Sequence, residues 1–595
     1  MAEKIISPGV FTNEIDQSFL PSAVADIGAA LIGPTLKGPA GIPTVVTSFS
    51  EFQAKFGDVF RSGSDSVQFL TSHTAEQYLK NSNTLTVVRI MDGTFAPATA
   101  SVTSATTTTP ATFASGTITI AAGGYGNQEV TIGGVDFTFV SGSTTVFDNN
   151  ASEIFVTSGA SVANSAANLR DAINNNISTH GLSISASRPA SDGVVVVSGS
   201  SAGTGANLSA ASSSVLFTIS GDKTKALEGG TDSSSSETSF VLKTLADGTI
   251  MNNADTTSTT NNVLVSGSKH NIRYEILSKN DKKGTFNLAI RAGNDNIKRK
   301  QTLETFNNLT LDPNSTNYIG KVIGDQRFTV RSDNGTKYLQ LSGSFPQKSK
   351  FVTVESINNT IDYLDENGNL RVDAASASLP AAGSGSENGG FGGGLDGFSG
   401  FDALGNHNGS KTGVTPANFY ENITGDNSQG FDLANAGAAQ GELAYIEALD
   451  LLANQDEYDI NLILAPGIIS NQHTTVASKI IDVCESRGDA FAVIDPVPYD
   501  STLAQATGQA ESRDSNFAAM YWPWIKVPDS QVAGTQRWVP PSVAIGGIYA
   551  FNDKVAHPWF APAGLNRGGI DIAIQAERKL TQGNRDDLYD SNVNP

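Results

Sequence analysis

A glycine-rich octapeptide and six histidines are the residues that first suggest nucleotide or metal chemistry. Residues 405–412, GNHNGSKT, come close to the phosphate-loop pattern GxxxxGK[ST], but the spacing is wrong and no strand precedes them. No histidine lies three to five residues from another, as paired metal ligands commonly do. The six are His73, His180, His270, His407, His473 and His557. The sequence therefore predicts no cofactor and no metal site.

Candidate nucleophiles and acid–base groups occur without the partners that catalysis needs. Gly199–Gly203 fits the pattern GxSxG after a predicted strand, but no helical pattern follows it. Cys484 lies inside a predicted helix directly after Val483, a position typical of a small buried residue. The carboxylates that flank a predicted strand end have no histidine nearby in sequence, so we interpret them as solvated caps; they are Glu485, Asp489 and Asp495. The chain is predicted not to be an enzyme.

Composition excludes several classes of partner. Among 595 residues, 38 Lys and Arg against 59 Asp and Glu give a formal net charge of −21. Such an acidic surface repels phosphate, which disfavours direct nucleic-acid binding. No apolar stretch approaches the roughly 20 residues that cross a bilayer, so membrane insertion is not expected. Met1–Lys4 lacks the order of a secretory signal, and a single cysteine allows no intrachain disulfide; both indicate a reducing cytoplasm.

Two distant stretches alternate apolar strands with amphipathic helices, a pattern typical of α/β domains. The first is expected to contain a strand at 23–33, a helix at 75–79 and a strand at 85–90. Between the first strand and the helix at 75–79, Phe49, Phe52, Phe56 and Phe60 recur at helical spacing, and Gly57 is expected to interrupt this aromatic face and end the helix. The second is expected to contain strands at 459–465, 490–495 and 517–525, with a helix at 474–487. Because both show the same pattern, we infer one α/β domain whose halves are separated by insertions.

Between these stretches the predicted elements are mostly strands. Residues 96–236 are rich in Ser, Thr, Gly and Ala, with alternating strands and a helix at 165–174; this favours a small β-domain over a low-complexity linker. Residues 240–373 alternate strands with a short helix near 302–309. Asp365–Asn369 is predicted to be a hairpin turn and not a calcium loop, which would need a later Glu. The glycine-rich stretch from Pro380 to Gly413 is expected to be an exposed loop.

Two further features suggest assembly. Residues 5–15 are predicted to form an extended arm, and a terminal strand must pair with an edge of its own subunit or of a neighbour. The arm residues that would set its bend and anchor it are Pro8, Gly9, Val10, Phe11 and Ile15. All four tryptophans fall near one end of the chain, at Trp522, Trp524, Trp538 and Trp559. They mark either a dense core or a buried subunit interface, and the sequence leaves both open.

Four segments in order resemble the contractile tail sheath proteins of myoviruses, most like the T-even type. They are SPGVFTNEID at 7–16, the segment 302–319 with TLETFNNL and LDPNS, the segment 541–568 with WFAPAGLNRG, and DLYDSNVNP at 587–595. Separately, Gly134–Val140 followed by Ala163–Asn174 is similar to a β-module of phage structural proteins. In the sheath family the chain continues past the last segment into a further α/β region with a C-terminal arm, so we expect that continuation to be missing here.

The resemblance implies a structural subunit that polymerises as stacked hexameric rings around a tail tube and contracts to drive the tube through the host envelope. It implies as partners further copies of the chain, the tail tube protein, and baseplate and tail terminator proteins. The implied location is the virion, as part of the tail sheath, after assembly in the host cytoplasm. An alternative function is a viral or bacterial surface adhesin with glycan-binding β-modules, and a third is a hydrolase built on the α/β core.

The expected fold is an α+β multidomain protein with a split α/β sheath core, two inserted β-rich domains and an extended terminal arm. The expected boundaries are an N-terminal arm at 1–20, a first core segment at 21–95, an outer β-rich domain at 96–236, a second β-rich domain at 237–375, a glycine-rich exposed region at 376–430, a second core segment at 431–540, and the start of a C-terminal sheath domain at 541–595.

Overall fold

The computed structural model describes residues 28–595, with gaps at 63–64, 105–112, 122–125, 142–148, 191, 201–206, 215, 221–226, 228, 230–237, 252–263, 265–266, 334, 360–378, 398–422, 434, 437–438, 530–534 and 558. The chain forms two compact units. The smaller is Ser104–Glu237, and the larger combines the residues up to Thr103 with Thr238–Pro595. Helices and sheets are mixed throughout, as the sequence predicts.

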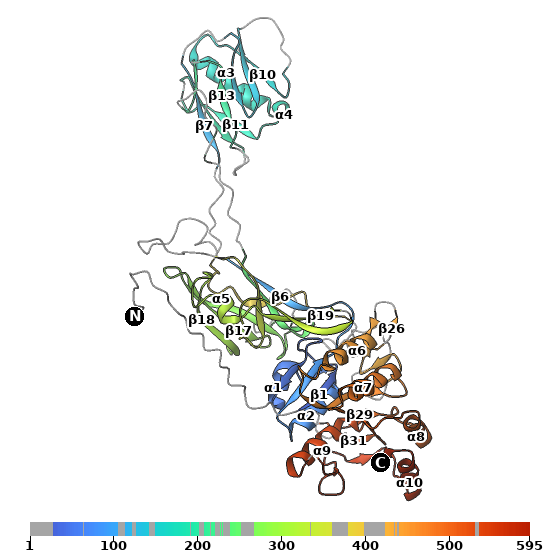
Figure 1. Cartoon of the computed structure of the whole chain (residues 1–595). Helices are drawn as coiled ribbons and strands as arrows, with labels where there is room; N and C mark the ends of the chain where they lie inside the picture. Colours follow the sequence, from blue (N-terminus) through green and yellow to red (C-terminus); the bar gives the residue numbers. More distant parts are fainter. Residues whose placement is uncertain are drawn as a thin grey trace, which may run out of the picture. The chain divides into compact units, whose positions relative to one another are not determined.

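A seven-stranded sheet lies at the centre of the α/β region of the larger unit, and its strands come from two distant stretches of the sequence (Figure 1). In spatial order they are β2 (Thr44–Val46), β5 (Leu85–Arg89), β1 (Gly28–Gly33), β28 (Ile460–Ile469), β29 (Phe491–Asp495), β30 (Ala518–Tyr521) and β34 (Val593–Asn594). All neighbouring pairs are parallel except β2 with β5. The pairing of β1 with β28 joins the two stretches that the sequence assigns to one domain.

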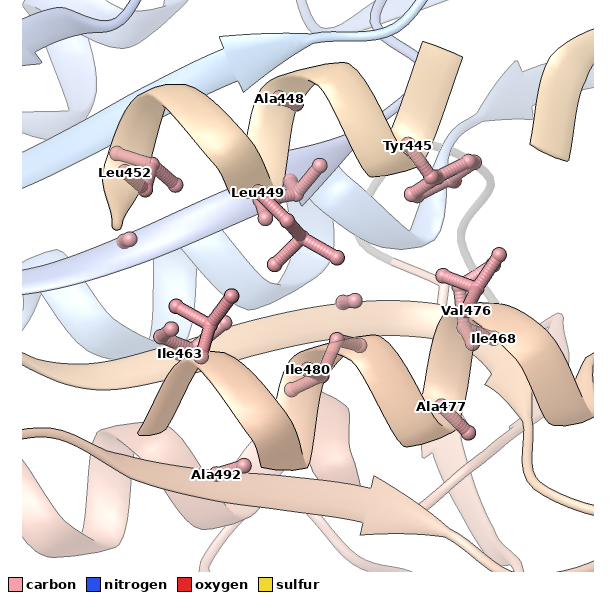
Figure 2. Packing of buried hydrophobic residues seen from close by; sticks show 14 of the residues in the cluster. Tyr445, Ala448, Leu449, Leu452, Ile463, Ile468, Val476, Ala477, Ile480 and Ala492 are labelled. Atoms are coloured by element: carbon pink, nitrogen blue, oxygen red, sulfur yellow. The ribbon is translucent and has the colours of Figure 1, made fainter. Parts of the chain in front are cut away.

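Helices cover both faces of this sheet, which explains why its strands are apolar on both sides. The helices of the larger unit are α1 (Phe49–Phe56), α2 (Leu70–Leu79), α5 (Ile319–Ile323), α6 (Gly441–Leu452), α7 (Thr474–Arg487), α8 (Leu503–Glu511), α9 (Ser542–Val555) and α10 (Gln582–Asp590). Ala29 and Leu31 share a buried cluster with α1, α2 and α9. Ala30 and Ile32 point the other way, into the cluster that Figure 2 shows between α6, α7 and strands β28 and β29.

The β-rich region of the larger unit consists of two four-stranded sheets that share one buried cluster. The first contains β6 (Phe95–Thr103), β15 (Thr238–Asp247), β21 (Val352–Ile357) and β23 (Leu395–Asp396). The second contains β16 (Ile272–Asn280), β17 (Thr285–Ala292), β18 (Thr302–Leu309) and β22 (Gly385–Gly390). The chain enters the smaller unit after β6 and returns at β15. These two strands are antiparallel neighbours, with Thr103 opposite Thr238.

The smaller unit has its own core, built from strands of both its sheets and from α3 (Val162–Asn175). Its strands are β7 (Ser115–Ile120), β8 (Gln128–Ile132), β9 (Val135–Val140), β10 (Glu153–Thr157), β11 (Ile184–Ser187), β12 (Val194–Gly199), β13 (Ala210–Ser212) and β14 (Phe217–Ile219). Helix α3 begins where the Ser161 side chain accepts a hydrogen bond from the Asn164 backbone, and it buries Leu169 and Ile173. A short α4 (Ile177–His180) follows.

Small sheets complete the larger unit. They are the hairpins β3 (Val59–Ser62) with β4 (Asp65–Gln68), β19 (Arg327–Asp333) with β20 (Thr336–Ser342), β24 (Asn427–Ser428) with β25 (Phe431–Asp432) and β26 (Asn435–Ala436) with β27 (Ala439–Gln440), and the sheet of β31 (Ile525–Pro528), β32 (Gln536–Val539) and β33 (Gln575–Ala576). The single strand expected at 517–525 is thus two strands, β30 and β31, in different sheets. Gly57 ends the aromatic helix at φ 74°, as the sequence predicts, and Phe60 beyond it lies in β3.

A buried ionic network ties the second β-sheet together. The Arg291 guanidinium donates to Asp295 from Nε at 2.8 Å and to Glu275 from Nη1 at 2.6 Å. Arg273 also pairs with Asp295, and Lys300 donates to Glu275 at 2.6 Å. The side chains of Arg273, Arg291 and Asp295 are almost wholly excluded from solvent. Two buried guanidinium groups therefore share the Asp295 carboxylate, and Arg291 is also paired with Glu275.

The helix expected near 302–309 is wrong, because this segment forms strand β18 against β17. Leu288 of β17 faces Phe306, and Phe286 faces Leu309, so the one residue between them on β17 opposes two residues on β18. Asn308 takes φ 54° within this bulge. The bulge turns Phe306 and Leu309 toward the same cluster although they are three residues apart. A spacing of three is also the helical spacing, which explains the wrong prediction.

The expectation that the glycine-rich stretch is exposed is wrong for its beginning. Leu379 and Phe391 are buried in the β-rich core, and β22 pairs with β16. Glycine permits this packing, because a Cβ on Gly389 would lie 2.1 Å from the Tyr274 backbone oxygen. Residues 398–422, which include the octapeptide of phosphate-loop type, lie outside the described residues, as does the predicted Asp365–Asn369 turn.

Candidate assembly surfaces

The predicted inter-subunit arm lies outside the described residues. Its five candidate positions are Pro8, Gly9, Val10, Phe11 and Ile15, and their role stays a prediction. The central sheet, which a strand from another copy could extend, has β2 at one edge and β34 at the other.

Two of the four tryptophans are core residues. Trp524 is 1% exposed, packs in a cluster with Val527 and Val539, and donates from Nε1 to the Val497 carbonyl at 3.0 Å. Trp522 is 2% exposed and packs against Leu588 and Val593, which fixes the last described segment to the core. For this pair, the structure places the side chains inside the subunit.

The other two tryptophans approach or reach the surface. Trp538 is half-buried, with its ring 5.5 Å from that of Tyr499 and the Lys526 ammonium 5.2 Å from its centroid. Trp559 is 77% exposed and stacks on His557 with ring centroids 4.4 Å apart. Closeness in sequence therefore does not make the four residues one cluster.

An exposed apolar loop follows α9. Its exposed large apolar side chains are Trp559, Phe560, Leu565 and Ile574, and the exposed Val555 at the end of α9 precedes them. Leu565 is 99% exposed, and the Arg567 guanidinium lies 5.0 Å from the Phe560 ring centroid. Exposed tryptophan and leucine side chains beside arginine are typical of protein interfaces. The available signal was the absence of helical or strand periodicity in WFAPAGLNRG, which argues against a buried element.

The hairpin β19–β20 presents a second apolar surface that the sequence did not identify. Phe328 and Leu341 form a cross-strand pair, and each is 48% exposed. The neighbouring pair Val330 and Leu339 is half-buried. Lys337 donates to Glu447 of α6 at 2.7 Å, so the hairpin is held against the α/β core. The sequence predicts strands within 240–373, but alternation alone does not show which face of a strand is covered.

The carboxylates weighed as catalytic groups have structural roles. Asp495 is buried at the end of β29, not solvated as expected, and accepts hydrogen bonds from the Ser542 backbone N–H at 3.1 Å and from the Ser542 hydroxyl at 2.6 Å. It therefore caps the start of α9 from inside the protein. Asp489 pairs with Arg487 at 2.9 Å, and Glu485 is exposed on α7.

Burial raises the pKa of Asp495 to about 7, although both hydrogen bonds from Ser542 favour the charged form. The folded protein thus holds this proton more tightly than the unfolded chain, whose carboxyl titrates near 3.8. The stability that this group contributes is complete below pH 4 and is lost as the pH rises through 7. We expect Asp495→Asn to remove that loss. Between pH 4 and 8 the free energy of unfolding of the variant, relative to that of the wild type, should therefore rise by about 2–4 kcal/mol.

Thermal melting of both proteins from pH 4 to 8 measures this difference. The amide suits the site, because it accepts from the Ser542 N–H and donates to the hydroxyl. Asp514→Asn, which removes an exposed carboxylate from the same domain, is the matched control. Parallel melting profiles for wild type and Asp495→Asn would contradict the prediction.

Other catalytic or metal chemistry finds no support in the described residues of the chain. Cys484 is buried in α7, and this burial raises the pKa of its thiol to about 12. His473 accepts from the Ile469 N–H and bonds the Thr424 carbonyl, and burial lowers its pKa to about 4. Among the described residues, no group of three His, Cys, Asp or Glu side chains could hold a metal ion. Nor does any helix there combine the length and apolar character required to span a membrane.

Residues 440–595, which include α6, α7, α9 and strands β28–β34, match the phage tail sheath protein central domain. This chain carries a phage tail sheath domain. Two curated relatives agree. The tail sheath protein of Enterobacteria phage T4 is 28% identical over 181 residues, and that of Vibrio phage KVP40 is 27% identical over 187 residues. The resemblance to T-even sheath proteins is thereby confirmed.

The sheath domain accounts for only a portion of each protein, since each match covers 27% of this chain and 27% of the relative. Among solved structures, the chain is similar to a sheath tail protein from Listeria innocua, with 9% identity, a TM-score of 0.37, and coverage of 95% of this chain and 64% of that one. The contracted helical sheath of the anti-feeding prophage gives 23% identity, a TM-score of 0.20, and coverage of 27% and 40%. The comparisons give no support to the alternative adhesin.

Proposed function

We propose that the chain is the structural subunit of a contractile tail sheath, which polymerises as stacked hexameric rings around a tail tube and contracts to drive the tube through the host envelope. The match of residues 440–595 to the sheath domain carries this proposal. The proposed partners are further copies of the chain, the tail tube protein, and the baseplate and terminator proteins. The subunit would assemble in the host cytoplasm, act in the virion and catalyse no reaction.

The physical basis of contraction would be a difference in free energy between two lattices of nearly rigid subunits. The central sheet, packed on both faces, supplies a rigid body that survives such a rearrangement. A head-to-tail contact that does not close generates a helical polymer. In the proposal, the arm at 1–20 crosses to a neighbour and adds a strand to a sheet there, which links subunits through backbone hydrogen bonds while they move.

The proposed arrangement assigns a role to each region of the chain. The two core segments, 21–95 and 431–540, would form the inner wall near the tube, together with the segment 541–595 that packs on them through α9 and β34. The β-rich domains at 96–236 and 237–375 would face outward. Their Ser- and Thr-rich composition supports this, because such surfaces are stable in water without a bound partner.

Negative-stain electron microscopy tests the assembly function. We expect rings or tubes from the intact chain and monomers from a version lacking residues 1–18. A full-length variant with Val10→Ser, Phe11→Ser and Ile15→Ser should also stay monomeric, because it keeps the arm but loses its apolar anchors. Thr12→Ser with Asn13→Ser is the matched control and should assemble.

The outcome that would contradict the proposal is an intact chain that stays monomeric even when preformed tail tubes are added. Assembly that survives loss of the arm would contradict only the arm's role.

A further inference from the structure

A cavity of about 260 Å³ opens at the amino ends of β28 and β29, beside α9. Ligands of α/β enzymes bind at the opposite, carboxyl ends of the strands, so the position of this cavity is not that of a catalytic site. Aromatic rings dominate its lining, and they come from Tyr78, Phe491, Tyr549 and Phe560. Phe560 belongs to the exposed apolar loop, which connects the cavity to that surface.

Two polar side chains of α9 line the same cavity, a buried amide and an exposed carboxylate. Asn552 is 2% exposed and donates from Nδ2 to the Phe560 carbonyl at 2.8 Å, while its Oδ1 has no hydrogen-bond partner among the described residues. Asp553 is the only charged residue of the lining, and within the described residues it has no ion-pair partner. Desolvation raises the pKa of this exposed carboxyl, and a hydrogen bond with the Asn552 side chain opposes the shift.

These features share one chemical requirement. The exposed Asp553 carboxylate lines the cavity, and a carboxylate favours a cationic hydrogen-bond donor. The faces of aromatic rings attract cations and also pack against aliphatic chains. Phe560 already shows this chemistry, since the chain's own Arg567 lies over its ring. The side chains of arginine and lysine combine an aliphatic stem with a cationic donor and are of a size that fits the cavity.

We infer that this cavity binds an arginine or lysine side chain presented by another polypeptide. Trp559 and Leu565 on the adjoining loop favour a protein partner over a free small molecule, because exposed apolar side chains of this size mark protein interfaces. The inference does not depend on the proposed sheath function, since the cavity belongs to the single subunit.

Ligand-observed NMR titration of the full chain with N-acetyl-arginine amide tests the inference. N-acetyl-citrulline amide, which has nearly the same shape without the charge, is the matched ligand. We expect saturable binding of the arginine amide with a Kd of about 1–10 mM, and at least about tenfold weaker binding of the citrulline amide. Asp553→Asn should weaken arginine binding by about tenfold, and Phe560→Leu should weaken it by about threefold.

The control variant is Asp514→Asn, which removes an exposed carboxylate elsewhere in the same domain and should bind like the wild type. Thermal melting shows that each variant is folded. Equal binding of the two amides, unchanged binding by Asp553→Asn, or no saturable arginine signal would overturn the inference. Preferential binding of N-acetyl-phenylalanine amide would overturn it in favour of an apolar side chain. Because these readouts need no polymer, failure here is distinct from failure of the assembly test.

Discussion

Replacing Asp295 with asparagine should destabilise the second β-rich sheet by about 3–5 kcal/mol, because it removes the buried negative charge that two buried guanidinium groups share. Arg273 and Arg291 both pair with this carboxylate, and neither can move to solvent. The asparagine side chain is almost the same size, so the loss measures charge and not a cavity. The expected loss of stability is large for a substitution that replaces a single carboxylate oxygen by an amide NH₂ group.

Hydrogen exchange followed by mass spectrometry measures the loss of stability in each segment separately. A local measurement is needed because a chain of several domains does not unfold in a single two-state step. We expect amides of β16 and β17 to exchange about 10²–10³-fold faster in Asp295→Asn, while β28 and β29 stay unchanged. Asp281→Asn breaks the exposed Lys279–Asp281 pair in the same sheet and should change stability by about 0–1 kcal/mol. Equal protection of β16 in the two variants would show that the buried network contributes no more than a surface pair.

The second large effect should come from Trp524. We expect Trp524→Ala to cost about 3–5 kcal/mol, because it opens a cavity in a packed cluster and leaves the Val497 carbonyl without its indole donor. The matched variant is Trp559→Ala, at a side chain that is mostly exposed. That change should alter subunit stability by less than about 0.5 kcal/mol.

Thermal melting of both variants, with electron microscopy of their assemblies, separates a core tryptophan from an interface tryptophan. Trp524→Ala should melt several degrees lower than the wild type. Trp559→Ala should melt like the wild type, and a loss of assembly in it would identify the exposed loop as a subunit contact. Equal melting temperatures for Trp524→Ala and the wild type would contradict the role of Trp524 in the core.

The α/β core could be predicted from the sequence because its strands are continuous apolar runs. A strand buried on both faces, such as β28 or β29, must be apolar at nearly every position, and this pattern has few alternatives when turn residues bound it. The similarity of two distant stretches predicts that they share one domain, but the pairing of β1 with β28 is seen only in the structure. The buried carboxylate of Asp495 could not be predicted, since its partner Ser542 lies 47 residues away.

The wrong predictions share a cause. The spacing of residues along the sequence does not show which distant segment the backbone will pack or pair with. At β18, a bulge at Asn308 gave strand residues a helical spacing. At Gly389, a missing side chain indicates close packing against Tyr274 and not a free loop. Trp524 is buried and Trp559 is exposed because their neighbouring segments pack differently in the folded protein. Composition alone could not separate the surface residue from the core residue.

Because β6 and β15 are neighbouring strands, residues 104–237 form an insertion that leaves and re-enters the larger unit at one place. Thr103 and Thr238 sit opposite each other in one ladder, so the space between them is that of an ordinary hairpin turn. Because the two ends of the insert already lie close together, no particular sequence is needed in the insert to connect β6 with β15. The entropic cost of closing this connection rises only slowly with the length of the insert. A connection of another length at this junction would therefore leave the register of β6 and β15 unchanged.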